Sequence, residues 1–258
     1  MLRNARQWSG RMNGAGTYSP RTQLYFVGTS GWSYDWNPNG IKWYVENSGL
    51  NAIELNASFY RFPSEKMVGK WAKVASNLRW SIKVNQLITH RLMLNEKALE
   101  YWNKFYKLFK PMEERGLVDF YLFQLPPRYR PTQRGVEKLE KFAQECGLGW
   151  RMAVEWRNLE WFREEWVVWA RSNEITVVSI DSPLGIFYIK SGPYVYVRFH
   201  GRIVWYAYRY TAEELAEAAA RLLALKPSKL YAFFNNDHDM LDNARLFLKI
   251  LEMLGGVQ

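Results

Sequence analysis

The most constraining feature of this chain is a regular alternation of short apolar runs with longer segments of helical period. Eight runs rich in Val, Ile, Phe and Tyr are typical of strands buried on both faces: 24–28, 51–56, 79–85, 118–125, 151–157, 176–181, 194–200 and 229–236. Between them, helices are predicted over 64–75, 95–115, 132–146, 158–172, 211–225 and 239–254. The connection 182–193 has no helical period and is expected to be a loop.

Capping signals support several of these helices. Ser64 precedes one helix and can accept a hydrogen bond from a first-turn N–H, and Thr211 with Glu214 forms a capping box. Eight strands that alternate with crossover helices predict a parallel sheet. Their number and the chain length favour an α/β fold, a closed (β/α)8 TIM-like barrel of one domain over 24–258. An open doubly wound sheet is the alternative, but no G-x-G-x-x-G motif follows the first strand.

The charge of the chain is unevenly distributed. Lys and Arg number 35 against 25 Asp and Glu, so the formal net charge is +10. Residues 1–23 contain four arginines and no acid, which predicts a basic, flexible arm, or alternatively an arm that lies on a phosphate backbone. The remaining 10 − 4 = +6 is compatible with a nucleic-acid partner, although surface Lys and Arg often serve only solubility.

Cysteine usage and hydropathy exclude several classes of protein. The single cysteine, Cys146, excludes a disulfide scaffold and a cysteine-based zinc cluster. No apolar run approaches the roughly 18 residues of a membrane span, and the N-terminus lacks the apolar core of a signal peptide. We therefore expect a soluble, cytoplasmic protein with no membrane partner.

Polar side chains collect at the C-terminal ends of the predicted strands, where barrel enzymes carry their active sites. Catalytic roles are predicted for Glu54, Glu155, Asp181 and His200, with Glu155 and Asp181 as metal ligands or general bases and His200 as the acid. The predicted substrate-binding residues are Lys83, Arg157 and Arg198 for an anion, His90 as a second proton donor, Gln124, Asn235 and Asn236 for orientation, and Trp32 and Tyr60 for stacking. The structural alternative is an ion-pair layer inside the barrel.

Several motifs, in order along the chain, resemble the signatures of the DUF72 family. They are GTSGWSYDW (28–36), ELNASFYRFPS (54–64), Lys83 with ITHRL (88–92), FQLPPRY (123–129), AVEWRNLEWF (153–162), VRFHG (197–201) with Tyr206 and Tyr210, and FFNND (233–237). The resemblance covers roughly residues 24–250. It implies a TIM-barrel-like fold and says little about activity, because the family is named for its unknown function.

The residues alone are compatible with three functions. The leading hypothesis is a hydrolase that cleaves phosphoester bonds in nucleic acid or nucleotides, with one Mg²⁺- or Mn²⁺-like ion held by oxygen ligands. The second is a glycosidase or sugar isomerase that uses Glu54 and Glu155 as acid and base. The third is a non-catalytic protein that binds nucleic acid or nucleotides.

Overall fold

The computed structural model describes residues 25–255, so the arm predicted over 1–23 lies outside the described residues. The strands are β1 (Tyr25–Thr29), β2 (Ala52–Leu55), β3 (Arg79–Lys83), β4 (Val118–Gln124), β5 (Met152–Glu155), β6 (Thr176–Ser182), β7 (Gly185–Phe187), β8 (Tyr194–Phe199) and β9 (Lys229–Phe234). The α-helices are α1 (Gly40–Asn47), α2 (Glu65–Val74), α3 (Glu96–Leu108), α4 (Lys110–Glu113), α5 (Gln133–Cys146), α6 (Glu164–Ser172), α7 (Ala212–Ala224) and α8 (Met240–Gly255).

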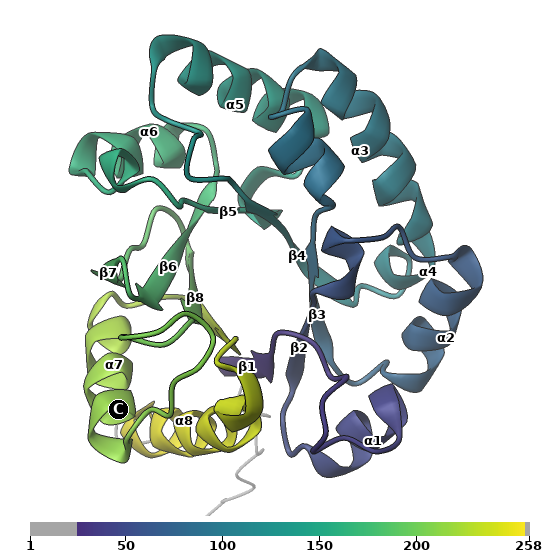
Figure 1. The fold of residues 1–258 in the computed structure, drawn as a ribbon, viewed down its shortest axis with the longest axis vertical. Coiled ribbons are helices and arrows are strands. Elements are labelled where there is room, and N and C mark those ends of the chain that lie inside the picture. Colours follow the sequence, from purple (N-terminus) through teal and green to yellow (C-terminus); the bar gives the residue numbers. More distant parts are fainter. Residues whose placement is uncertain (1–24, 256–258) are drawn as a thin grey trace, which may run out of the picture.

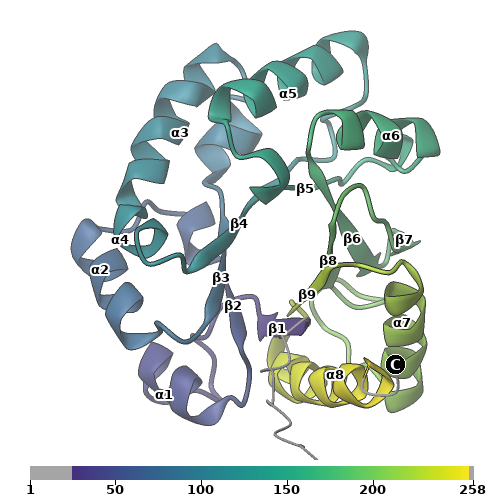
Figure 2. The ribbon, with the colours of Figure 1, turned by 180° about the vertical axis from the view of Figure 1, so that it is seen from behind.

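Eight parallel strands form a nearly closed barrel in the order β1-β9-β8-β6-β5-β4-β3-β2, and β7 pairs antiparallel with β6 outside this path. The helices surround the ring of strands on its outside, as both views of the ribbon show (Figures 1 and 2). The predicted TIM-barrel-like fold is therefore confirmed. None of the helices within residues 25–255 is long and apolar enough to span a bilayer.

The barrel closes between β1 and β2 through side chains rather than a full ladder. One bridge, Ser30 to Glu54, joins the two strands. The Tyr44 hydroxyl accepts a hydrogen bond from Thr29 N (3.1 Å) and donates one to Ala52 O (3.0 Å). The strands approach so closely that a Cβ on Gly28 would lie 2.2 Å from Ala52 O. A glycine is needed there because any side chain would collide with the β2 backbone.

The structure differs from the sequence expectation in a few connections. The segment 182–193, expected to be a loop, contains β7, which forms a hairpin with β6. The helix expected over 95–115 is interrupted at Phe109, just before Pro111, because proline cannot donate the helical N–H bond. The helix expected over 158–172 begins only at Glu164, after a short 3-10 turn. Helix α1 was not predicted.

Successive side chains of each strand point to opposite faces of the sheet and so contribute to two separate apolar layers. One layer packs between strands and helices and forms the larger core. The other fills the barrel interior with the side chains of Phe26, Ala52, Phe120, Leu122, Ala153, Val178, Ile180, Tyr196, Tyr231 and Phe233. Towards the C-terminal ends of the strands, the next inward-facing positions are polar, and this end of the barrel is called the mouth below.

Candidate functional site

Six ionisable side chains come together at the mouth because they share the inward parity of their strands. We call Glu54, Lys83, Glu155, Arg157, Arg198 and His200 the mouth cluster. Five of them lie an even number of residues from an interior apolar position, as Glu155 does from Ala153 and Arg198 from Tyr196, and Lys83 lies two residues after Ser81, whose hydroxyl contacts the interior Tyr196. All six are at least nine-tenths buried, with Lys83 6% and Arg157 8% exposed. The structure thus brings these six of the predicted site residues together at one end of the barrel.

Arg198 is the centre of the mouth cluster. Its guanidinium is fully buried and bridges two buried carboxylates, bonding Glu54 Oε1 through Nη2 at 2.7 Å and Glu155 Oε2 through Nη1. Burial opposes the charged form, but the two carboxylates raise the pKa of Arg198 above its ordinary value. An arginine fits this position because its planar fork can serve two acceptors at once.

Glu54 is held by further hydrogen bonds from two neutral side chains. Ser30 Oγ donates to Oε1 at 2.7 Å and Tyr196 Oη donates to Oε2 at 2.6 Å. The Tyr196 hydroxyl in turn lies 2.8 Å from Ser81 Oγ. Sequence reasoning missed Tyr196, although its position two residues before Arg198 gives it the same inward parity.

Arg157 and His200 both face the carboxylate of Glu155. Arg157 Nε forms an ion pair with Glu155 Oε1, and its guanidinium lies over the Trp205 ring at 4.3 Å from the centroid. His200 Nε2 lies 3.3 Å from the same Oε1, and Asn235 Nδ2 lies 3.3 Å from Nδ1. Arg157 Nη2 also lies 3.3 Å from His200 Nε2, so this nitrogen faces both a guanidinium and the Glu155 carboxylate.

These surroundings fix the protonation states of both groups. Burial alone would raise the pKa of Glu155, but Arg157 and Arg198, together with His200, hold it well below its usual range. Burial and the charge of Arg157 lower the pKa of His200 to about 3. Glu155 is therefore a fixed anion and His200 a neutral imidazole at pH 7. The expected role of His200 as the acid does not fit this environment.

Lys83 differs from the other cations of the mouth cluster because no carboxylate within residues 25–255 forms an ion pair with it. Its Nζ lies 4.4 Å from the centroid of the Phe59 ring. Burial and the charge of Arg198 lower the pKa of Lys83 to about 7, although Glu54 and Glu155 act in the opposite direction. Lys83 is therefore present in both protonation states near neutral pH.

His90 lies beside Lys83 at the rim of the mouth. Its ring packs edge-on against Phe59, with 5.0 Å between the ring centroids, and Nδ1 lies 2.9 Å from Thr89 Oγ1. Burial and the charge of Lys83 lower the pKa of His90 to about 4. The ring is neutral at pH 7, so it does not add to the positive charge of the mouth.

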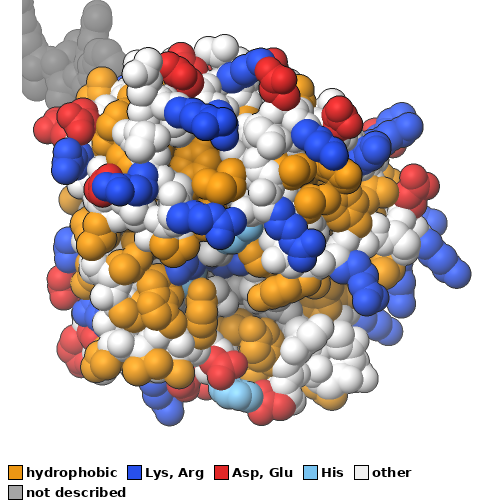
Figure 3. All heavy atoms as spheres, turned by 45° about the horizontal axis from the view of Figure 1, so that its top comes forward, with side chains coloured by type: hydrophobic (Ala, Val, Ile, Leu, Met, Phe, Trp, Pro, Cys, Tyr) orange, Lys and Arg blue, Asp and Glu red, His pale blue; other side chains and the backbone are white. Residues whose placement is uncertain are grey.

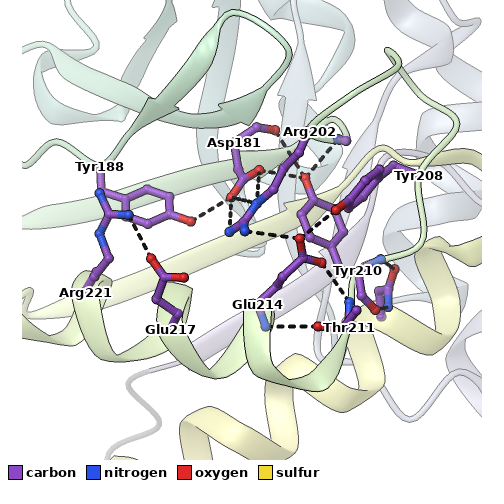
Figure 4. Close-up of polar contacts among 11 residues, drawn as sticks. Asp181, Tyr188, Arg202, Tyr208, Tyr210, Thr211, Glu214, Glu217 and Arg221 are labelled. Carbon is purple, nitrogen blue, oxygen red and sulfur yellow. Dashed lines mark hydrogen bonds and ion pairs between the residues drawn. The ribbon is translucent and has the colours of Figure 1, made fainter.

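Asp181 does not join the mouth cluster, contrary to the sequence expectation. It follows the inward-facing Ile180, so it points outward towards α7. There its carboxylate accepts hydrogen bonds from Arg202 (3.1 Å), Tyr188 (2.8 Å) and Tyr210 (3.0 Å), and Arg202 also reaches Glu214 (Figure 4). Asp181 thus holds the loop after β8 to the barrel wall, and the expected pairing of Asp181 with Glu155 as metal ligands is not formed.

The donor set at the mouth does not fit a divalent cation. Between residues 25 and 255 there is no group of three or more His, Cys, Asp or Glu side chains placed to hold a metal ion. The two carboxylates nearest one another, Glu54 and Glu155, already share the guanidinium of Arg198 between them. A cation at this point would have to displace Arg198 from both carboxylates.

The remaining predicted residues lie around the mouth at different depths. Trp32 and Tyr60 line one pocket of about 170 Å³ together with Ser30, Tyr34 and Asn56. Tyr60 is 71% exposed, whereas Trp32 packs against the tryptophans of α2 and β3. The pocket is large enough for one planar ring between the two predicted stacking residues.

The three predicted amides have different surroundings. Asn235 contacts His200 as described above, and Gln124 ends β4 with a buried Oε1 that has no hydrogen-bond partner within the described part of the chain. Asn236 has the outward parity and bonds Asn243 of α8 and the backbone of the loop after β8. Asn235 therefore lies at the mouth beside His200, whereas Asn236 is bound to α8 and to the loop after β8.

One family model matches most of the chain. The family model described as "Protein of unknown function DUF72" matches residues 26–257. The chain belongs to the DUF72 family. A search of curated proteins finds no match. The barrel, the mouth cluster and the outward Asp181 are thus features of a DUF72 protein whose family description leaves the activity open.

Solved DUF72 structures share the fold over most of their length. A DUF72 protein from Thermotoga maritima is 29% identical, with a TM-score of 0.77 over 89% of this chain and 100% of that one. A DUF72 protein from Enterococcus faecalis V583 is 22% identical, with a TM-score of 0.77 over 89% of this chain and 96% of that one. A D-psicose 3-epimerase solved in the presence of D-fructose is 12% identical, with a TM-score of 0.56 over 91% of this chain and 100% of that one, and it shows only the fold.

Proposed function

We propose that this DUF72 protein binds a phosphate-bearing ligand of nucleotide or nucleic-acid type at the barrel mouth and hydrolyses its phosphoester bond. The observation that carries the proposal is a surplus of cations in the mouth cluster. Glu54 and Glu155 offset two positive charges, whereas Arg157, Arg198 and protonated Lys83 supply three. A buried surplus charge favours an anionic ligand, since a phosphodiester would complete the balance.

The guanidinium and amine at the open side of the cluster suit the binding of phosphate oxygens. Arg157 is positioned by Glu155 on one side and by the Trp205 ring on the other, so it loses little conformational freedom when a ligand binds. Trp205 and the pocket between Trp32 and Tyr60 offer aromatic faces for a base.

Lys83 is the group best placed to accept a proton. A general base works best when its pKa lies near the working pH, which is the range to which burial and Arg198 bring Lys83. In the proposed reaction the neutral Lys83 amine takes a proton from water as the water oxygen forms a bond to phosphorus and the phosphorus–ester oxygen bond breaks. The ester oxygen leaves with the bonding electron pair and takes up a proton from solvent, and the Lys83 ammonium returns its proton to solvent. The carboxylates are less suited, because both are already bound to Arg198.

A glycosidase or sugar isomerase fits the site less well for the same reason. An acid–base pair needs carboxyl groups that exchange protons, and Glu155 is held as an anion by two guanidinium groups. The third hypothesis, binding without catalysis, shares the anion site and is separated from hydrolysis by turnover alone.

The test uses the full chain with bis(4-nitrophenyl) phosphate and with 5′-labelled single-stranded and double-stranded DNA and RNA, each with and without EDTA. We expect hydrolysis that persists in EDTA and is lost in Lys83→Met and in Arg157→Met. Lys229→Met is the matched control, because Lys229 begins β9 at the opposite end of the barrel. It should leave binding and turnover unchanged.

The pH dependence gives a second readout. Binding of a phosphodiester should weaken as pH rises through about 7, because Lys83 loses its charge, whereas His90 stays neutral and Glu155 stays an anion. Turnover should rise over a range above 7, since the bound anion raises the pKa of Lys83. Binding without any cleavage would leave a non-catalytic binding protein, and absence of both would refute the proposal.

A further inference from the structure

A basic hollow lies beside the mouth, at the start of α5. It has a volume of about 290 Å³, and its lining includes Arg128, Arg130, Arg134 and Lys138 but no acidic side chain. A second hollow of about 600 Å³ adjoins it between α3 and α5 and shares Arg134 and Lys138 in its lining. We call the two together the α5 groove. Figure 3 shows Lys and Arg side chains gathered over this upper part of the molecule.

The positive charge is concentrated in the part of the α5 groove that is nearer the mouth. Arg130 is neutralised by Glu160 at 2.5 Å, but Arg134 and Lys138 form no ion pair with any residue of 25–255. The farther hollow also contains glutamates, and its Lys141 is paired with Glu96 at 2.7 Å. The first turn of α5 contains no acid, so the helix dipole adds to the field of the basic side chains.

Direct contacts connect this groove to the mouth cluster. Arg128 Nη2 donates a hydrogen bond to the backbone oxygen of His90 at 2.5 Å. The His90 ring contacts Phe59, which also contacts the Lys83 amine. A row of cationic side chains therefore runs from Lys83 in the mouth through Arg128 to Arg134 and Lys138 on α5.

We propose that the α5 groove binds the sugar–phosphate backbone of a single-stranded nucleic acid that enters the mouth. The inference rests on the proposed function, because it assigns the same ligand a path out of the same site. A row of cations over an open groove suits a chain of phosphates rather than one ion. Arg134 and Lys138 lie one helical turn apart, about 6 Å along the axis, so each can meet a separate phosphate.

The chemistry of the α5 groove favours a single strand and recognition independent of sequence. Its lining offers charge and helix N–H groups, which contact phosphates, and no exposed aromatic ring for a base. The pocket between Trp32 and Tyr60, at about 170 Å³, has room for one unstacked ring, which a single strand supplies without the cost of opening a duplex.

The test compares two charge-matched double variants of the full chain. Arg134→Gln with Lys138→Gln removes two charges four residues apart on α5, and Lys66→Gln with Lys70→Gln removes two exposed charges at the same spacing on α2. Fluorescence anisotropy measures binding of a labelled 20-nucleotide single strand, a 20-base-pair duplex and a labelled dinucleotide over a salt series.

We expect the α5 variant to lose two phosphate contacts with the single strand. A plot of the logarithm of the association constant against the logarithm of salt concentration should become shallower by about 2 × 0.7 = 1.4. If the wild-type and variant lines meet at 1 M salt, this change of slope corresponds to about 25-fold weaker binding by the variant at 0.1 M salt. Dinucleotide binding should stay unchanged, because a dinucleotide occupies only the mouth, and the α2 variant should match the wild type.

Other outcomes separate this inference from the proposed function. An equal loss in the α2 variant, or no loss in the α5 variant, overturns the groove while dinucleotide binding still supports the mouth. Duplex binding that is tighter than single-strand binding overturns the choice of a single strand. If the wild type binds neither the dinucleotide nor the 20-mer, both the groove and the proposed function fail.

Discussion

Replacement of Arg198 by methionine tests whether the mouth cluster is held together by one buried cation. The guanidinium is fully buried and bonds both Glu54 and Glu155, which are also fully buried. Methionine has a similar length and no charge, so Arg198→Met leaves two carboxylates facing each other without their shared partner. Removal of one member of a buried ion pair costs about 3–5 kcal/mol. At about 2–4 °C per kcal/mol, the midpoint of thermal unfolding should fall by roughly 6–20 °C.

The loss should depend on pH with a definite sign. In the wild type the folded-state pKa of Glu155 lies well below its unfolded value, so its contribution to stability is present above that value and lost as pH falls. In the variant the two carboxylates have raised pKa values, which destabilise the fold as pH rises. The difference in free energy of unfolding between wild type and Arg198→Met should therefore grow between pH 4 and pH 7.

Urea denaturation followed by tryptophan fluorescence gives the free energies of unfolding. Arg130→Met is the matched control, because it removes one partner of the exposed pair with Glu160 and should leave the urea midpoint unchanged. Arg198→Met combined with Glu54→Gln should recover part of the loss, since one buried negative charge disappears. A loss in Arg198→Met no larger than that of the control, or one independent of pH, would refute this account of the cluster.

Three further predictions concern other parts of the fold. Gly28→Ala should destabilise the protein by about 1–3 kcal/mol or more, because the added Cβ would lie 2.2 Å from Ala52 O. Gly69→Ala should instead stabilise helix α2 by about 0.5–1 kcal/mol, because its added Cβ would have nothing within 4 Å. Thermal unfolding of the two variants and the wild type measures both effects. Burial raises the pKa of Cys146 to about 11, so a thiol reagent at pH 8 should react slowly with the folded protein and rapidly in urea. Asp181→Asn should weaken the ion pair with Arg202 that holds the loop after β8. Amide hydrogen exchange should then be faster over residues 201–210 and unchanged in α3, which serves as the control.

The barrel could be predicted from the sequence because its strands are short, apolar and separated by helices of clear period. All eight barrel strands lie where the apolar runs were found, with ends that differ by at most two residues. The hairpin strand β7 was missed because its three residues are too few for a periodic signal. Helix α1 was missed because it is only eight residues long and begins at Gly40, whose φ of +66° no helical pattern predicts.

The sequence predicts which residues of the candidate site lie at strand ends, but not which of their side chains form ion pairs with one another. Which residues end a strand can be read from the apolar runs, whereas which face each residue occupies requires the phase of the alternation. The phase was available, since Ile180 and Asp181 are neighbours and only one can point inward. The ion pairs of Arg198 with Glu54 and Glu155 could not be predicted, because these residues are far apart in the sequence and meet only across the barrel.

The way β1 joins the ring has a consequence for the biosynthesis of the protein. Its full-length ladder is with β9, the last strand within residues 25–255, and its contact with β2 is a single bridge supplemented by Tyr44. During translation β1 therefore emerges before the other strands of the ring but must wait for residues 229–234 before it can form this ladder. The partly made barrel exposes a strand edge that is open to wrong partners until β9 has been made.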